Sequence, residues 1–581
     1  MAQAYFKAFI TGYERMVAWS DLLDQINVFP VADADTGRNL KISLAPLRQL
    51  ADNPDVVPRN LIRAATGNSG NIAAAFFYEL LGIDNAERLP TTIQVGFDKA
   101  QQAVVNPAPG TMLTLFEALA QAMAVADKTP DQWDTGAIIR RMQETVSATS
   151  ETLPECKKAG VVDAGALGMF IFLEAFLGCL TDRMDQDRPV TEIFAGKLEI
   201  AADYHPGGTD DAYCVSAMIQ AQGSGEEVRR RLARLGESMV VTEGADGVKV
   251  HLHTASREQL RSGLEALGHV VDWAEESIAY TRPAPAQTGA VHVMTDAAGS
   301  ITVEDARQLG ITLLNSYLVV GDQSCPETLY APEKLYAAMR AGTKVSTAQA
   351  SMFERHQSYL SALSRHPRVL YLCVGSVYTG NHATAAAWKE HGDPDNRLTI
   401  IDTGVASGRL AVVVLSTARY AQGEADPEAV VDFACQAVVR SREFVFLDQL
   451  KYLVAGGRIS KTKGFFGDLL HMKPIITPTA TGAEKVGVVR HRDDQLNFAM
   501  ARLKDNFESG DAPLIVLQYS DNRDWVEQSA AERIRGFLPA AEIQFRPLSL
   551  TSGAHMGPGT WAVAFLSPEN PSPVVSDDTS A

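Results

Sequence analysis

The spacing of apolar residues changes along this chain, and that change limits the folds it can adopt. In the first 190 residues apolar side chains recur every three to four positions, with almost no alternating stretch. This spacing predicts amphipathic helices over residues 5–26, 59–81, 112–126, 136–152 and 164–180. After residue 290, strand-like apolar runs alternate with helical patterns. The sequence therefore predicts an all-helical amino-terminal domain and an α/β carboxyl-terminal half.

The chain of 581 residues is too long for one hydrophobic core, so we expect several domains. We place a helical domain at residues 1–190, a small α/β domain at 196–285 and a larger α/β domain at 290–567. Residues 568–581 are rich in Pro, Ser and Asp and are expected to be a disordered tail.

Charge and cysteine usage narrow the class of protein. A formal net charge of −18 with no basic block disfavours nucleic acid as a partner. The six cysteines are widely spaced, which is typical of reduced thiols in the cytoplasm. The most apolar segment, residues 159–180, carries Asp163 and Glu174 and predicts a buried helix rather than a transmembrane one. We therefore expect a cytoplasmic location.

Residues 27–39 read Asn-Val-Phe-Pro-Val-Ala-Asp-Ala-Asp-Thr-Gly-Arg-Asn. Asp33 and Asp35 are two apart in a loop of small residues, so both carboxylates could hold Mg²⁺. Thr36 or Asp35 is expected to cap the helix that follows, leaving backbone N–H groups near a bound phosphate. The alternative is an acidic turn that merely begins a helix.

A glycine-rich segment at residues 66–71 reads Thr-Gly-Asn-Ser-Gly-Asn and opens an apolar helical run. Its glycines would let backbone N–H groups approach a phosphate, with the Ser69 hydroxyl as a further donor. The same glycines could instead let two helices pack closely.

These two segments, with two more, resemble the DhaL-like kinase domain of dihydroxyacetone kinases and of the bacterial fatty acid kinase. The family's first string reads close to Asn-Val-Phe-Pro-Val-Pro-Asp-Gly-Asp-Thr-Gly-Thr-Asn, so Ala34 and Arg38 are departures. Residues 109–114 (Pro-Gly-Thr-Met-Leu-Thr) and 161–168 (Val-Val-Asp-Ala-Gly-Ala-Leu-Gly) resemble its further loops, with Pro109 where glutamate is usual. Taken from the residues alone, the first of these is only a helix start and Asp163 is an N-cap.

The resemblance implies ATP with two Mg²⁺ ions. Its metal ligands would be Asp33 and Asp35, which are also the catalytic residues, together with Asn27. Its nucleotide-binding residues would be Thr36, Gly37, Asn39, Gly67, Asn68, Ser69, Gly70, Gly110, Thr111, Met112, Asp163 and Gly165.

In the middle segment, residues 248–253 read Val-Lys-Val-His-Leu-His. The period of two predicts a strand with Lys249, His251 and His253 on one face, so two imidazoles could share a metal. The alternative is a pair of solvent-facing histidines. The segment resembles the middle domain of the nucleotide-binding component of fatty acid kinase, which implies a Zn²⁺ site made by Cys214, His251 and His253.

The last 290 residues carry a series of segments that resemble the DegV family of fatty-acid-binding proteins. They are residues 295–296, 346–351, 375–380, 456–460, 473–475 and 553–559. Ala348 and Ala350 are departures from the family's pattern. The resemblance implies that Thr347, Ser376, Thr379, Arg458 and His555 bind a fatty acid. The hydroxyls of Thr347 and Ser376 and the imidazole of His555 could converge on its carboxylate, or each could serve only turn chemistry.

The resulting hypothesis is an ATP-dependent fatty acid kinase fused to its lipid carrier, which forms an acyl phosphate for an acyltransferase. A homodimer and transient membrane contact are left open. The alternatives are a dihydroxyacetone-type kinase and a lipid-binding or sensor protein with a degenerate nucleotide site. A Ser/His hydrolase is disfavoured, because the chain has no Gly-x-Ser-x-Gly elbow.

Overall fold

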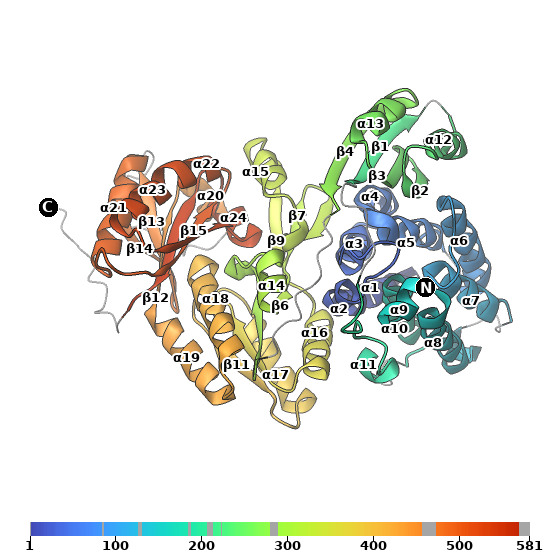
Figure 1. Cartoon of the computed structure of the whole chain (residues 1–581), viewed down its shortest axis with the longest axis horizontal. Helices are drawn as coiled ribbons and strands as arrows, with labels where there is room; N and C mark the ends of the chain where they lie inside the picture. Colours follow the sequence, from blue (N-terminus) through green and yellow to red (C-terminus); the bar gives the residue numbers. More distant parts are fainter. Residues whose placement is uncertain are drawn as a thin grey trace. The chain divides into compact units, whose positions relative to one another are not determined.

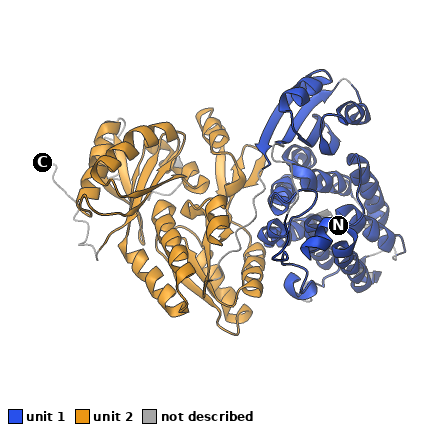
Figure 2. Ribbon diagram, in the orientation of Figure 1, with its two compact units in different colours: residues 1–283 blue, residues 284–581 orange. Residues whose placement is uncertain are grey.

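The structure is a computed structural model that describes residues 2–83, 86–125, 130–183, 188–205, 213–221, 223–278, 289–455 and 472–568. The chain divides into two units, residues 1–283 and 284–581, which are coloured blue and orange in Figure 2. Figure 1 labels most of the helices and strands of each unit.

Helices build the first part of unit 1, as the apolar spacing predicts. They are α1 (Ala2–Val17), α2 (Ser20–Gln25), α3 (Thr36–Leu44), α4 (Val57–Ala64), α5 (Gly67–Leu80), α6 (Leu89–Ala103), α7 (Met112–Ala124), α8 (Thr135–Thr152), α9 (Pro154–Ala159), α10 (Ala164–Leu180) and α11 (Val190–Ile193). Two predicted helices are each divided in two, at residues 18–19 and 65–66.

Helix α10 is buried along nearly its whole length and packs against α1, α7 and α8. Because it is apolar on every side, it needs protein around it throughout. Its Glu174 pairs with the buried Arg15 of α1 at 3.0 Å. No helix in the described part of the chain is long and apolar enough to cross a membrane. The prediction of a buried helix is therefore confirmed.

The second part of unit 1 is an antiparallel sheet with strand order β2-β3-β1-β4 and two helices. Its elements are β1 (Tyr213–Ala221), α12 (Gly225–Leu232), β2 (Glu237–Gly244), β3 (Gly247–Thr254), α13 (Arg257–Glu265) and β4 (Gly268–Ser277). One face of the sheet packs on α12 and α13, with Val215, Val250 and Leu252 in the core between them.

The other face of this sheet lies against the helical part of unit 1. Helix α5 contacts β2 and β3, and Val240 of β2 joins Ala75 and Ala103 in a small shared core. The N–H of Val105 donates to the carbonyl of Met239. The helices and the sheet are therefore packed together as one unit.

Unit 2 contains a parallel sheet of order β11-β10-β5-β6 and a mixed sheet of order β14-β13-β12-β17-β15-β16. A small antiparallel sheet, β8-β7-β9, accompanies them. The strands are β5 (His292–Asp296), β6 (Thr312–Leu314), β7 (Tyr317–Val320), β8 (Gln323–Pro326), β9 (Val345–Ala348), β10 (Val369–Cys373), β11 (Leu398–Asp402), β12 (Ser441–Phe446), β13 (Lys473–Thr479), β14 (Gly482–Val489), β15 (Leu514–Tyr519), β16 (Glu542–Pro547) and β17 (Trp561–Leu566).

Helices alternate with these strands, as in α/β proteins generally. They are α14 (Val303–Leu309), α15 (Pro332–Arg340), α16 (Met352–Arg365), α17 (Asn381–Gly392), α18 (Ser407–Gly423), α19 (Pro427–Arg440), α20 (Leu450–Ala455), α21 (Arg492–Lys504), α22 (Arg523–Trp525), α23 (Glu532–Phe537) and α24 (Leu550–Met556). Helix α18 contacts strands of both large sheets and contributes to one apolar core with them. The predicted multidomain fold class, with two sheet-based subdomains in this half, is confirmed.

Candidate active site

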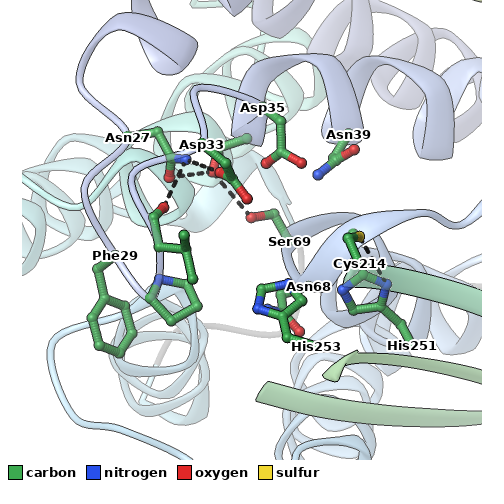
Figure 3. Close-up of a pocket in the computed structure, with 14 residues that line it drawn as sticks. Asn27, Phe29, Asp33, Asp35, Asn39, Asn68, Ser69, Cys214, His251 and His253 are labelled. Atoms are coloured by element: carbon green, nitrogen blue, oxygen red, sulfur yellow. Dashed lines mark hydrogen bonds between the residues drawn. The ribbon is translucent and has the colours of Figure 1, made fainter. Parts of the chain in front are cut away.

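Asp33 and Asp35 lie in the loop between α2 and α3, where both line a pocket (Figure 3). The Nδ2 of Asn27 donates to Oδ1 of Asp33 at 2.7 Å, and its Oδ1 accepts from the Thr36 hydroxyl at 2.8 Å. Thr36 is in turn 3.4 Å from the hydroxyl of Ser69. Asn27 therefore fixes the orientation of the Asp33 carboxylate and ties the loop to the beginning of α3.

Ala34 separates the two aspartates and has φ +55°. Only glycine adopts this left-handed region without steric cost. The family string has glycine at this position, so Ala34 keeps the same backbone turn at some cost in strain. The turn is what lets two carboxylates so close in sequence face one pocket.

The predicted cap of α3 is wrong. Asp35 stands at the N-cap position, yet its side chain accepts no capping hydrogen bond. Instead Oδ1 of Asp24, at the end of α2, accepts from the N–H groups of Gly37 at 2.6 Å and Arg38 at 3.1 Å. Gly37 permits this approach of α2, because a Cβ there would lie 1.9 Å from the carbonyl oxygen of Ser20. With α3 capped by Asp24, the Asp35 carboxylate is left for the pocket.

Burial is the main cause of the raised carboxylate pKa values in and beside this loop. It raises the pKa of Asp33 to about 8, assisted by the neighbouring Asp35 carboxylate. Burial also raises the pKa of Asp24 to about 8, although the two N–H groups that it accepts oppose that rise. A cation bound beside Asp33 would favour the ionised form of its carboxylate.

The glycine-rich segment at residues 66–71 serves two purposes. Gly67 begins α5 with φ +62° and lines the pocket together with Asn68 and Ser69. Gly70 instead allows close helix packing, because a Cβ there would lie 2.0 Å from the Ser43 hydroxyl. The interpretation as a phosphate loop and the packing alternative thus each fit part of the segment.

Cys214, His251 and His253 form the group that the sequence singles out in the middle segment. Their ligand atoms all lie within 4.8 Å of one another. Burial lowers the pKa of both imidazoles, that of His251 well below its usual value, so both are neutral at pH 7. Burial also raises the pKa of the Cys214 thiol to about 12. Two neutral imidazoles and a thiol are a donor set that fits Zn²⁺, which displaces the thiol proton on binding.

The two histidines are not solvent-facing, contrary to the alternative interpretation of the pair, and Cys214 is partly buried. Their face of the sheet packs on the helical part of unit 1, and His251 is fully buried. They line the same pocket as the aspartates, as Figure 3 shows. The residues that line it are Asn27, Phe29, Pro30, Val31, Asp33, Asp35, Thr36, Asn39, Gly67, Asn68, Ser69, Cys214, His251 and His253. Two parts of unit 1 thus contribute to one site.

Arg38, a departure from the family string, forms an ion pair between the helical part of unit 1 and the middle sheet. Its guanidinium donates to Glu276 of β4 at 2.8 Å, and both side chains are substantially exposed. The pair links α3 to the middle sheet.

The two further loops of the helical part meet each other outside the residues of this pocket. A Cβ on Gly165 would lie 2.7 Å from Cε of Met112. Thr111 caps α7, and Asp163 caps α10 by accepting from the N–H of Ala166 at 2.7 Å. Gly110 has φ +83° and donates its N–H to Thr114. Their role in nucleotide binding remains a prediction.

In unit 2 the Thr347 hydroxyl lies 3.3 Å from Nε2 of His555, so β9 and α24 bring these two together. The backbone N–H of Ser376 donates to Oδ1 of Asp402 at 2.9 Å. The hydroxyl of Thr379 accepts from the N–H of Asn381. Arg458 and the rest of residues 456–460 lie outside the described residues. Convergence of Thr347, Ser376 and His555 on one carboxylate remains a prediction.

Two buried carboxylates that the sequence analysis did not single out support this region. Asp296 accepts from the side chains of Arg355, Tyr371 and Asn381 and from the N–H of Val374, and so holds both ends of the loop that carries Ser376. Glu327 accepts from the N–H of Thr551 at the beginning of α24. Asp296 belongs to a segment that resembles the DegV family, so the sequence could have pointed to it, whereas only packing reveals Glu327.

Comparison with family models identifies the parts of the chain. The DAK2 domain model matches residues 30–178, and the DegV family model matches residues 290–568. Between them, residues 210–278 match the model of a middle domain like that of the A component of fatty acid kinase. The chain is a fusion of these three domains. The pocket that holds Asp33 and His253 therefore lies between the DAK2 domain and the middle domain.

Relatives that match part of the chain are also found. Protein YloV of Bacillus subtilis is 27% identical over 281 residues, which cover 43% of this chain and 50% of YloV. An uncharacterised protein of Staphylococcus aureus is 30% identical over 274 residues, which cover 42% of this chain and 50% of that protein. The chain thus spans about half the length of the curated relatives it matches.

Solved structures align with the DegV domain. A DegV family protein from Thermus thermophilus, described by its fatty acid binding, covers 48% of this chain and 99% of its own, with 22% identity and a TM-score of 0.44. DegV from Bacillus subtilis, described as a fatty acid binding protein, has the same coverage, 18% identity and a TM-score of 0.44.

Proposed function

We propose that this protein is an ATP-dependent fatty acid kinase joined to its lipid carrier. The observation that carries the proposal is the single pocket lined by Asp33 and Asp35 of the DAK2 domain and by Cys214, His251 and His253 of the middle domain. The middle-domain model that matches the chain is named for a component of fatty acid kinase. The DegV domain would supply the acyl substrate.

In this proposal Asp33 and Asp35 hold Mg²⁺, which neutralises charge on the phosphates of ATP when bound. Asn27 keeps the Asp33 carboxylate oriented through its 2.7 Å hydrogen bond. The beginning of α5 presents N–H groups beside Asn68 and Ser69, a favourable place for phosphate oxygens. Asn39 reaches the same pocket from α3.

Cys214, His251 and His253 are the residues that would hold Zn²⁺, which acts as a Lewis acid toward an oxygen ligand when bound. Their place in the pocket of the aspartates supports a role in the reaction rather than in folding alone.

The reaction needs little acid-base chemistry. A fatty acid carboxylate is ionised at neutral pH, so it can attack the γ-phosphorus of ATP without losing a proton. The bond from that phosphorus to the bridging oxygen breaks, ADP leaves with the electron pair, and an acyl phosphate forms. The Thr347 hydroxyl and the His555 imidazole, which lie 3.3 Å apart, would donate hydrogen bonds to the carboxylate of the stored acid.

The test uses the full chain with ATP, Mg²⁺ and oleate, and hydroxylamine to trap an acyl phosphate as the hydroxamate. We expect hydroxamate with the wild-type chain and far less with Asp33→Asn. Oleate binding without hydroxamate would favour a sensor with a degenerate nucleotide site. Phosphorylation of dihydroxyacetone but not of oleate would favour the other kinase class.

A further inference from the structure

His251 stands out in the pocket because its two ring nitrogens have different surroundings. Nδ1 lies 3.0 Å from the hydroxyl of Ser216. Nε2 is buried and has no hydrogen-bond partner within the described part of the chain. A buried polar atom without a partner is uncommon in a native fold and often marks an ion that the atom binds.

Ser216 is fixed in place by the sheet. It lies directly opposite His251 in the register of β1 and β3, just as Cys214 lies opposite His253. Alternation along β1 puts Cys214 and Ser216 on the same face. Ser216 is 8% exposed, so water competes little for its hydroxyl.

The hydroxyl and the ring can be arranged in two ways. If Ser216 donates to Nδ1, the proton of the neutral ring sits on Nε2, where it has no acceptor. If Ser216 accepts from Nδ1–H, the lone pair of Nε2 is free to bind a metal ion. In many metal sites an acceptor next to the ligand histidine fixes its ring in this way. The second arrangement leaves the imidazole ring with no unpaired buried N–H.

We propose that Ser216 is the positioning residue of the Cys214–His251–His253 site, accepting from Nδ1–H of His251 so that Nε2 binds Zn²⁺. This inference rests on the metal site of the proposed function and adds the ligand atom and the group that selects it. Figure 3 shows the imidazoles of His251 and His253 side by side, with Cys214 next to His251.

The rival assignment makes Nδ1 the ligand, since Sγ of Cys214 is 4.0 Å from it. In that case the Ser216 hydroxyl would compete with the metal for Nδ1. The two assignments therefore predict opposite effects of removing the hydroxyl. Ser216→Ala weakens Zn²⁺ binding under our proposal, and leaves it unchanged or strengthens it under the rival.

The experiment measures the Zn²⁺ affinity of the metal-stripped full chain by competition with a chromophoric chelator. We expect Ser216→Ala to bind roughly 10- to 100-fold more weakly, the usual cost of losing the hydrogen-bond partner of a ligand histidine. Ser216→Thr keeps the hydroxyl and should recover most of the affinity. The matched control is Thr242→Val, which removes a buried hydroxyl without a described partner from the neighbouring strand β2.

Co²⁺ supplies a second readout that a merely structural role would not change. The wild-type chain should show the visible bands of tetrahedral Co²⁺, and these should shift in Ser216→Ala but not in Thr242→Val. Equal Zn²⁺ affinity in Ser216→Ala and the wild type would overturn the proposal while leaving the metal site intact. Absence of Zn²⁺ binding by the wild type would overturn the site itself, whatever the result of the hydroxamate test.

Discussion

The two units differ in how far their candidate sites are assembled. In unit 1, residues from positions 27 to 253 line one pocket, and most are those that the sequence motifs point to. In unit 2, Thr347 and His555 are in contact, whereas Ser376 is bonded to Asp402. The aspartate loop and the glycine-rich segment, each at the start of a helix, reach one pocket with the histidines of β3, whereas the motifs at residues 109–114 and 161–168 meet outside it. Motifs spread over three sheets depend on how those sheets pack.

The two sites nevertheless share one structural device. Each has a carboxylate that accepts from N–H groups at the start of a helix carrying site residues, Asp24 for α3 and Glu327 for α24. Burial raises the pKa of Asp24 to about 8 and that of Glu327 to about 7. In both cases a residue with no proposed role in the reaction positions residues that have one.

The largest effect is expected for Asp33→Asn, which should change acyl phosphate formation but not oleate binding. Asp33→Asn should lower acyl phosphate formation roughly 1,000-fold, as expected when a main source of electrostatic stabilisation is lost. Oleate affinity should not change, because Asp33 belongs to unit 1. The measurement is turnover by hydroxamate trapping, with the exposed Asp55→Asn as control. Equal turnover in Asp33→Asn and Asp55→Asn would show that Asp33 takes no part in the reaction.

Glu327 gives unit 2 a pH dependence of its own. Its folded-state pKa of about 7 exceeds the usual value of 4.5, so the folded chain holds a proton that the unfolded chain has lost. Its contribution to stability is therefore complete below about pH 4.5 and is lost as the pH rises through 7. The full difference is on the order of 3 kcal/mol.

Glu327→Gln cannot ionise, so it should lose less stability than the wild type between pH 5 and pH 8. Chemical denaturation at several pH values gives this difference directly. If the unfolding free energy of the two proteins changed with pH in parallel, Glu327 would have its usual pKa. The raised pKa that it is inferred to share with Asp24 would then be wrong.

Thr347 tests whether unit 2 has a site of the proposed kind. Thr347→Val removes the hydroxyl beside His555 and should weaken oleate binding roughly 10-fold, about the worth of one hydrogen bond to a charged group. Fluorescent fatty acid displacement measures this affinity. Ser346→Ala is the matched control, since Ser346 is its exposed neighbour on β9. A similar affinity in both variants would place the carboxylate elsewhere.

Asp24 has the smallest expected effect. Asp24→Ala removes the cap of α3 and should cost about 1 kcal/mol of unfolding free energy, as N-cap losses usually do. Asp24→Asn keeps an oxygen that can accept from Gly37 and Arg38, so it should retain most of that stability. Denaturant titration compares the two. If Asp24→Ala is as stable as Asp24→Asn, then Asp24 does not hold α3.

Much of the fold and part of the site could be predicted from the sequence. Alternation placed His251 and His253 on one face of β3, and the apolar spacing found the helices of the first unit. What covers the histidine face of β3 could not be predicted, because it depends on α5 packing against β2 and β3, which lie more than 150 residues further along the chain. The break between α1 and α2 was also missed, since Trp19 continues the apolar pattern and is buried.

The aspartate loop and the middle-domain residues act as one reaction centre if the proposed function is right. The direct measurement is acyl phosphate formation by full-length His253→Ala at saturating ATP and Mg²⁺, with ATP affinity determined on the same protein. We predict that ATP binding is retained while transfer falls at least about 100-fold. Transfer at the wild-type rate in His253→Ala would contradict a shared centre.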